Sequence, residues 1–344
     1  MSHGLEKIAQ LAGVSKSTVS RVINDQPNVN QKTRERVLKI IREVNYRPNR
    51  AARALVTQHT RVLSVVIPQA LASTFTDPYF PALIQNISLT ASQNDYAIML
   101  WVGDSAEEED RFCDRILDNS FFDGVLIASA VDDDPLLKRL AGTNVPYVLI
   151  GPPQQGARYY VDVDNRNAAC HAVSHLINLG YRRIATISGV LRLGAARARL
   201  QGYRDALCAA GIEVDERLIV EGHYDEPSGY QRMLELIPLG VDAVFCASDV
   251  MALGALRAAA SIGLRVPGDV AIVGFDDIPF TSTNQPALTT VSQPIAELGS
   301  MATQMLIRLI DGAPVEQPAV VLPAHLIIRS TCGANERSMP RSEN

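Results

Sequence analysis

The sequence predicts an α/β protein with two doubly wound parallel-sheet lobes, preceded by a small all-α helix-turn-helix domain. The chain has 344 residues, more than one domain usually holds. From residue 61 onward, apolar strands alternate with amphipathic helices in two successive series of similar size. This alternation is typical of parallel sheets covered by helices on both faces. The first 60 residues show helical spacing of apolar side chains instead.

Charge divides the chain at the same place. Residues 1–60 contain eleven Lys and Arg against four Asp and Glu, whereas the remainder contains 21 against 33. A basic head therefore precedes an acidic body. Such a head indicates a polyanionic partner, because its Lys and Arg side chains can displace counterions from phosphates. A solvated charged helix is the alternative.

Composition excludes several classes of protein. Hydrophobic residues make up 47% and charged residues 20% of the chain, which is ordinary for a globular protein. No apolar run approaches the roughly 18 residues of a membrane span, and charged side chains interrupt the start where a signal peptide would be apolar. We therefore expect a cytoplasmic protein. The five cysteines lie far apart with no CxxC pair, so we expect no metal and no cofactor.

The head is predicted to hold three short helices. Apolar side chains recur at helical spacing in residues 5–12 and 16–23, on either side of Gly13. Ser15 is a suitable N-cap for the second of these helices. A third amphipathic helix is expected from about residue 31 to 44. Two short helices joined at a glycine form a candidate helix-turn-helix.

A hinge is expected after the head. Pro48 ends the first domain, residues 1–48, because the residue before a proline avoids helical geometry. The next segment, residues 49–61, opens with an Ala/Arg-rich stretch that favours a helix. That stretch is shorter than the roughly 12 residues at which an isolated helix becomes marginal. We expect it to be helical only when something holds it.

The two lobes are predicted from residues 62–332. In the first series we expect strands at 62–68, 97–102, 124–129 and 146–151, and helices near 79–93 and 105–118. In the second we expect strands at 183–188, 243–248 and 270–275, and helices near 166–179, 196–210, 227–237 and 250–262.

One more helix and one more apolar stretch are expected after these two series. A helix near 295–311 and an apolar stretch at 320–328 indicate that the chain crosses back between the lobes. A ligand is expected in the crevice at the carboxyl ends of the strands. The tail, residues 333–344, is polar and is expected to be disordered.

Four motifs carry a resemblance to a known family. LEKIAQLAGVSKSTVSRVIN, NYRPNRAARAL, SDVMALGAL and VGFDDIPF occur in this order. With them the chain resembles the LacI/GalR family of bacterial transcriptional regulators from about residue 4 to 330. The resemblance implies a homodimeric repressor that binds double-stranded operator DNA. It also implies a hinge helix and a periplasmic-binding-protein-like core that senses a small-molecule effector, usually a sugar.

DNA-contacting residues are expected on the second helix. Its N-terminal part can present Lys16, Ser17, Ser20 and Arg21 to the major groove. By the resemblance, Lys16 and Ser17 occupy the pair of positions that sets base specificity, and Arg21 matches a position that contacts base or phosphate. A cap is the favoured role for Ser15. A solvated polar face is the alternative for the whole set.

The hinge is expected to contact the minor groove. By the resemblance, Leu55 matches a leucine that wedges between bases and kinks the duplex. Asn49, Arg50 and Arg53 are then candidates for phosphate or minor-groove contacts. An ordinary linker is the alternative.

Ligand-binding residues are matched on local motifs. Asp276 follows a strand into the crevice, where a carboxylate can accept hydrogen bonds from sugar hydroxyls. Arg199 matches an inducer-binding arginine, with a structural ion pair as the alternative. Gln293 matches a polar contact on a crossing strand. Asp249 is either a ligand contact or part of a helix cap.

Aromatic side chains are expected to line the same pocket. Tyr79, Phe80 and Tyr224 match lining positions, although core packing is an equal alternative for Phe80. Gly151, Pro152 and Pro153 stand where some family members have an acidic or Arg side chain, which favours a glycoside larger than a monosaccharide. Trp101 could stack on a second sugar ring or belong to the core.

Other functions remain to be weighed. An enzyme, such as a sugar-processing one, is disfavoured because the nucleotide-binding, nucleophile-elbow and HExxH motifs are absent, and no catalytic residues are expected. His171 and His175 are spaced for a metal but lack a third ligand nearby. A periplasmic solute-binding protein would need a signal peptide. A purine-type corepressor remains an alternative to an inducing sugar.

Overall fold

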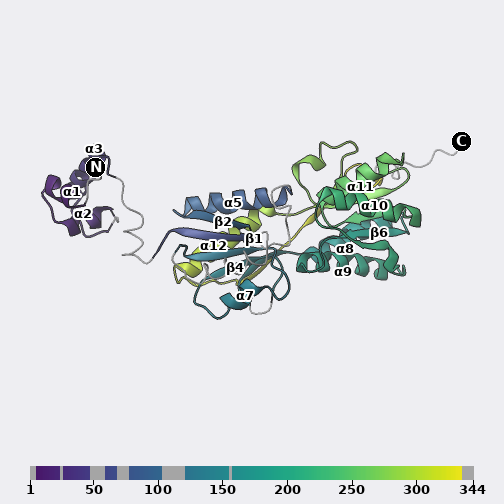
Figure 1. Ribbon diagram of the computed structural model, residues 1–344, viewed down its shortest axis with the longest axis horizontal. Coiled ribbons are helices and arrows are strands. Elements are labelled where there is room, and N and C mark those ends of the chain that lie inside the picture. Colours follow the sequence, from purple (N-terminus) through teal and green to yellow (C-terminus); the bar gives the residue numbers. More distant parts are fainter. Residues whose placement is uncertain are drawn as a thin grey trace. The chain divides into compact units, whose positions relative to one another are not determined.

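The computed structural model describes residues 5–23, 26–46, 59–67, 77–102, 121–154 and 157–334. The chain forms two units, Met1–Thr60 and Arg61–Asn344 (Figure 1). The predicted helix at 105–118, nearly all of the predicted hinge and the tail beyond residue 334 lie outside the described residues. The domain boundaries stay predictions, and the division between the units falls inside the expected hinge.

Three helices surround one small core in the first unit. They are α1 (Leu5–Ala12), α2 (Lys16–Ile23) and α3 (Gln31–Glu43). The buried core consists of Ile8, Ala9, Ala12, Val19, Val22 and Val37. Gly13 has φ +63°, which allows the sharp turn between α1 and α2. The Ser15 hydroxyl accepts the backbone N–H of Thr18 at 3.1 Å, so Ser15 caps α2 as predicted.

The first lobe of the second unit contains a six-stranded parallel sheet in the order β11-β5-β4-β3-β1-β2. Its strands are β1 (Val62–Ile67), β2 (Ala97–Val102), β3 (Gly124–Ala128), β4 (Tyr147–Ile150), β5 (Tyr160–Val163) and β11 (Ala319–Leu322). Its described helices are α5 (Tyr79–Gln93), α7 (Pro135–Leu140) and α12 (Ile295–Ile310). Leu63 and Val65 of β1 belong to the cluster that includes α5 and α12, whereas Val66 belongs to the cluster with α7. Helices therefore cover both faces of the sheet.

The second lobe contains a six-stranded sheet in the order β12-β10-β9-β8-β6-β7. Its strands are β6 (Ile184–Ser188), β7 (Ile219–Glu221), β8 (Ala243–Cys246), β9 (Ala271–Asp276), β10 (Thr289–Ser292) and β12 (His325–Ile327). Its helices are α8 (Asn165–Asn178), α9 (Gly194–Ala209), α10 (Glu226–Leu236) and α11 (Asp249–Ser261), with short 3-10 turns at Glu216–Leu218, Ile237–Leu239 and Pro279–Thr281. The pair α8 and α9 packs on one face and the pair α10 and α11 on the other (Figure 1).

The predicted fold class is confirmed, with one departure in the second sheet. Strand β12 runs antiparallel to β10, so that sheet is not wholly parallel. Three strands and one short helix were not expected from the sequence, namely β5, β7, β10 and α7.

The chain crosses between the lobes three times. It passes to the second lobe after β5, returns before α12 and crosses again between β11 and β12. The apolar stretch at 320–328 is thus two short strands, one in each lobe, separated by Pro323 and Ala324. In the part of the chain that the structure describes, no helix is long and apolar enough to cross a membrane.

Candidate functional site

A cavity with about 660 Å³ of empty space, part of it open to solvent, lies between the two lobes. Its lining comes from both of them: Asp77, Tyr79, Phe80, Ser129, Ala130, Ile150, Gly151, Pro152, Asp162, Val163, Asn165, Leu193, Gly194, Ala195, Arg199, Tyr224, Asp276, Gln293 and Leu298. Most of these residues lie at or just beyond the carboxyl ends of β3, β4, β5, β9 and β10. This is the crevice in which the sequence predicts a ligand.

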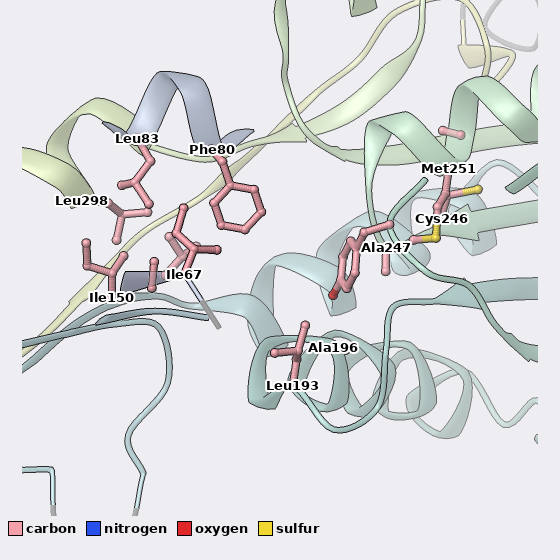
Figure 2. Close-up of a cluster of buried hydrophobic side chains, with 14 of the residues drawn as sticks. Ile67, Phe80, Leu83, Ile150, Leu193, Ala196, Cys246, Ala247, Met251 and Leu298 are labelled. Atoms are coloured by element: carbon pink, nitrogen blue, oxygen red, sulfur yellow. The ribbon is translucent and has the colours of Figure 1, made fainter. Parts of the chain in front are cut away.

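Apolar side chains from both lobes surround the cavity. Figure 2 shows Ile67, Phe80, Leu83, Ile150 and Leu298 gathered on the first lobe, facing Leu193, Ala196, Ala247 and Met251 of the second. All of them belong to one buried cluster. Polar groups in the cavity therefore act against an apolar background, where each hydrogen bond and charge has a large effect.

Arg199 of α9 is fixed by its neighbours. The side chain is almost fully buried, and its guanidinium lies 3.7 Å from the centre of the Phe275 ring. Nε donates to Asn165 Oδ1 at 2.8 Å, and Nη1 donates to the Ala247 carbonyl at 2.5 Å. Nη1 also lies 3.6 Å from Asp276 Oδ1. The guanidinium is thus held rigidly beside the carboxyl group.

Asp276 ends β9 in a strained backbone conformation. Its φ is +125°, and Ser129 and Tyr224, which also line the cavity, have φ of +60° and +59°. Such conformations are costly for residues other than glycine and tend to cluster at functional sites. Gln293 Nε2 donates to Asp276 Oδ1 at 2.5 Å. Burial raises the pKa of Asp276 well above its usual value, while Arg199 opposes this rise.

The first lobe adds two carboxyl groups that the sequence did not single out. Asp77 Oδ1 accepts the backbone N–H of Tyr79 at 3.0 Å, and Asp162 Oδ1 accepts an N–H of Asn165 at 3.2 Å. Burial raises the pKa of Asp77, and it raises the pKa of Asp162 to about 7. The cavity therefore holds three carboxyl groups and, among its described lining, one guanidinium.

Three predicted aromatic side chains line the cavity. Tyr79 and Phe80 pack edge to face with ring centres 5.1 Å apart, and Phe80 is also buried in the core. Tyr224 lies so close to Gly189 that a Cβ there would approach its ring within 2.0 Å. Because Gly189 has no side chain, it leaves room for the Tyr224 ring. Burial raises the pKa of Tyr224 to about 12, so its hydroxyl stays protonated at neutral pH.

The lobes also contact each other beside the cavity. Arg197 Nη2 of the second lobe lies 2.6 Å from Asp132 Oδ1 of the first, and the Asp132 N–H donates to the Arg192 carbonyl at 3.2 Å. A β-bridge joins Val131 to Leu193. These contacts hold the lobes together.

In the head, α2 has a buried side and an exposed side. Val19 is buried, whereas Lys16, Ser17 and Arg21 are exposed and Ser20 is half-buried. The ammonium group of Lys16 lies 3.1 Å from Glu6 Oε1. The predicted hinge contacts Asn49, Arg50, Arg53 and Leu55 lie outside the described residues.

Comparisons with known proteins identify the family. Residues 4–49 match the family described as bacterial regulatory proteins, lacI family, and residues 173–332 match a periplasmic binding protein-like domain. The HTH-type transcriptional regulator CelR of Thermobifida fusca is 40% identical over 333 residues, which cover 95% of this chain and 97% of CelR. This chain belongs to the LacI family. It is a DNA-binding transcriptional regulator, and the enzyme alternative is excluded because its relatives are regulators.

Other LacI-family members match nearly the whole chain as well. The transcriptional repressor CytR of Escherichia coli K12 is 34% identical over 343 residues, 96% of each chain. A solved CelR–cellobiose complex is 38% identical with a TM-score of 0.76, covering 96% of this chain and 99% of that one. A lac repressor dimer bound to operator and an anti-inducer is 30% identical with a TM-score of 0.84 and the same coverage.

The geometry distinguishes among the predicted ligand residues of this LacI-family chain. Six of the seven line the cavity: Tyr79, Phe80, Arg199, Tyr224, Asp276 and Gln293. Asp249 does not. It is fully buried, and its oxygens accept the Thr290 hydroxyl at 2.5 Å and the Ile278 N–H at 3.1 Å. Ser248 is the N-cap of α11, so Asp249 instead holds the turn that follows Asp276.

Two further expectations concern the size of the pocket. Gly151 and Pro152 line the cavity, whereas Pro153 is not among its described lining residues, and the preference for a larger glycoside stays a prediction. Trp101 is half-buried in β2 opposite Val66 and is not among the described lining residues. In the described ranges, no group of three His, Cys, Asp or Glu side chains is placed to hold a metal ion.

Proposed function

We propose that this regulator is a cytoplasmic repressor that binds operator DNA as a homodimer and is released by a small sugar or glycoside bound between its lobes. The buried arrangement of Arg199, Asp276 and Gln293 in the cavity carries the proposal. A guanidinium donates to sugar oxygens, a carboxylate accepts from sugar hydroxyls, and aromatic rings pack on the C–H faces of a sugar. The cellobiose complex of CelR supports this choice of effector.

The exposed side of α2 supports the DNA-binding part of the proposal. Lys16 and Arg21 can reach base edges or phosphates, while Val19 and Val22 anchor the helix in the head. The segment 49–55 would add minor-groove contacts, with Leu55 as the wedge.

The effector is tested by thermal unfolding of the full chain with a panel of uncharged mono- and disaccharides that includes cellobiose. A sugar that binds the folded state raises the unfolding temperature. Gel shifts on the regulator's own promoter DNA then give the sign of the response. Release by the sugar supports induction, whereas tighter DNA binding would indicate a corepressor. If no member of the panel binds, the proposed effector class is wrong.

The DNA contact is tested with two lysine variants of the head. Lys16→Ala should cost about 1–3 kcal/mol of discrimination between cognate and random DNA, because a base contact is lost. Lys39→Ala is the matched control, since Lys39 lies on α3, is exposed and pairs with Glu43 at 3.8 Å. Equal losses of discrimination in both variants, measured by fluorescence anisotropy, would contradict the role of α2.

A further inference from the structure

The described first-lobe lining of the cavity contributes carboxyl groups but no cationic side chain. Asp77 lies just before α5 and Asp162 lies in β5, and both line the cavity together with Asp276. Among the described lining residues, Arg199 is the one that carries a positive charge. Three carboxyl groups thus face the space in which one guanidinium lies.

The closest contacts of the Arg199 guanidinium are with groups outside the first-lobe wall. Its Nη1 lies 3.6 Å from Asp276 Oδ1, and both side chains are nearly fully buried. The hydrogen bonds to Asn165 and Ala247 fix the guanidinium in that place. Arg199 thus lies closest to Asp276, and its charge also opposes the rise that burial causes in the pKa of Asp77 and Asp162, so three carboxyl groups share one guanidinium.

The two first-lobe carboxyl groups can also accept from a ligand. One oxygen of Asp77 accepts the Tyr79 N–H, and one oxygen of Asp162 accepts an Asn165 N–H. A carboxylate has about four acceptor sites, so each group retains capacity for a hydroxyl donor. An anionic ligand would bring an acceptor to these same groups, and like charges repel strongly where water is largely excluded.

We propose that Asp77 and Asp162 make this cavity select uncharged glycosides and reject the carboxylated or phosphorylated forms of the same sugars. The inference rests on the proposed function, because it assumes that a sugar occupies the cavity. It adds the charge class of that sugar and the residues that determine it. Asp162 is the better test residue, since Asp77 also binds the backbone at the start of α5.

The test uses isothermal calorimetry on the full chain at pH 8.5, where Asp162 is ionised because burial raises its pKa only to about 7, with two probes of nearly equal size. They are cellobiose and cellobiouronic acid, in which a carboxylate replaces one hydroxymethyl group. The parent should bind cellobiose at least about tenfold more tightly than the acid, and Asp162→Asn should reduce that ratio by about tenfold. Glu316→Gln is the matched control: it removes an exposed charge before β11 of the same lobe and should leave the ratio unchanged.

The outcomes separate this inference from the proposed function. If no uncharged sugar of the panel binds, the proposed function fails and the inference fails with it. If cellobiose binds and the acid binds as tightly to the parent, the charge inference is overturned while the proposed function stands. An unchanged ratio in a folded Asp162→Asn protein also overturns it. Should that variant not fold, Asp77→Asn provides the same comparison.

Discussion

The two walls of the cavity are built differently. On the second-lobe wall, Arg199 and Asp276 are buried, bonded to neighbouring groups and paired with each other. On the first-lobe wall, Asp77 and Asp162 are carboxyl groups whose described neighbours in the cavity include no second cation. The contrast suggests that one wall supplies a fixed recognition pair, whereas the other restricts which ligands can enter.

Removing Arg199 should have the largest effect on stability, because it breaks the buried pair of the second-lobe wall. Arg199→Ala leaves Asp276 buried without its cation, and breaking a buried pair typically costs about 3–5 kcal/mol of unfolding free energy. The loss should be greater at pH 8 than at pH 5, because protonation of Asp276 relieves its unpaired charge. Chemical denaturation at both pH values measures it. Arg217→Ala is the control, since Arg217 forms an exposed pair with Asp215, and equal losses in both variants would contradict the difference.

Changing Asp276 should affect the fold as well as the ligand, because Arg199 then stays buried without its carboxylate. Asp276→Asn should weaken effector binding by about 1.5–3 kcal/mol, because a charge-assisted hydrogen bond is lost. Operator affinity without effector should change little, so the repressor would stay on DNA. Calorimetry with the sugar identified by thermal unfolding measures the first effect, and gel shifts measure the second. Unchanged sugar affinity in a folded variant would mean that Asp276 serves the turn and not the ligand.

A smaller effect is expected from the residues that hold the turn. Thr290→Val removes the hydroxyl bonded to Asp249 and should cost about 1–2 kcal/mol of stability. Effector affinity should also fall several-fold, because Asp249 fixes the strained turn after Asp276.

Thr186→Val provides a matched control for this prediction. Thr186 is equally buried in the second lobe, and its hydroxyl donates to the Phe245 carbonyl at 3.0 Å. It should lower stability by a similar amount without changing effector affinity. If both variants weaken the effector alike, the turn has no separate role in binding.

Sequence motifs revealed the second-lobe wall more completely than the first. Asp276 follows a long apolar strand within VGFDDIPF, so it could be placed from local pattern, and Arg199 was assigned by its match to an inducer-binding arginine of the family. Asp162 lies in β5, whose sequence YVDV is short and has only two fully buried residues. Its neighbours β4 and β11 complete the sheet around it, and β11 comes from far along the chain. A local sequence pattern cannot predict the pairing of two strands that lie so far apart in the chain.

The segments that cross between the lobes were also predicted incompletely from local sequence. The sequence predicted one apolar stretch at 320–328, but Pro323 and Ala324 divide it into strands of different sheets. Register with β5 and β10 decides this division, and both partner strands were missed. Asp77 was missed for a related reason, because its place in the cavity depends on how α5 packs on the first lobe.

The smallest expected effect is a pH dependence that belongs to the first-lobe wall. Burial raises the pKa of Asp162 from 3.8 to about 7, so its ionisation is less favourable in the folded than in the unfolded chain. The stability that this group contributes is full below pH 4 and is lost as pH rises through about 7. The unfolding temperature should therefore fall between pH 5 and pH 8, and Asp162→Asn should flatten part of this slope.

Other titrating groups also contribute to the pH dependence of stability and remain in Asp162→Asn. Burial also raises the pKa of Asp249 to about 7, so a slope of the same sign should remain in Asp162→Asn. The lowered pKa of His175 affects both proteins alike and cancels in the comparison. Asp269 is the control: its bonds with Arg265 lower its pKa to about 2, so Asp269→Asn should shift stability without altering the slope in this window. Calorimetric scans at pH 5, 6, 7 and 8 measure the slopes. Identical slopes in the parent and Asp162→Asn would contradict this prediction, because they would show that Asp162 does not bind a proton in the folded chain in this pH range.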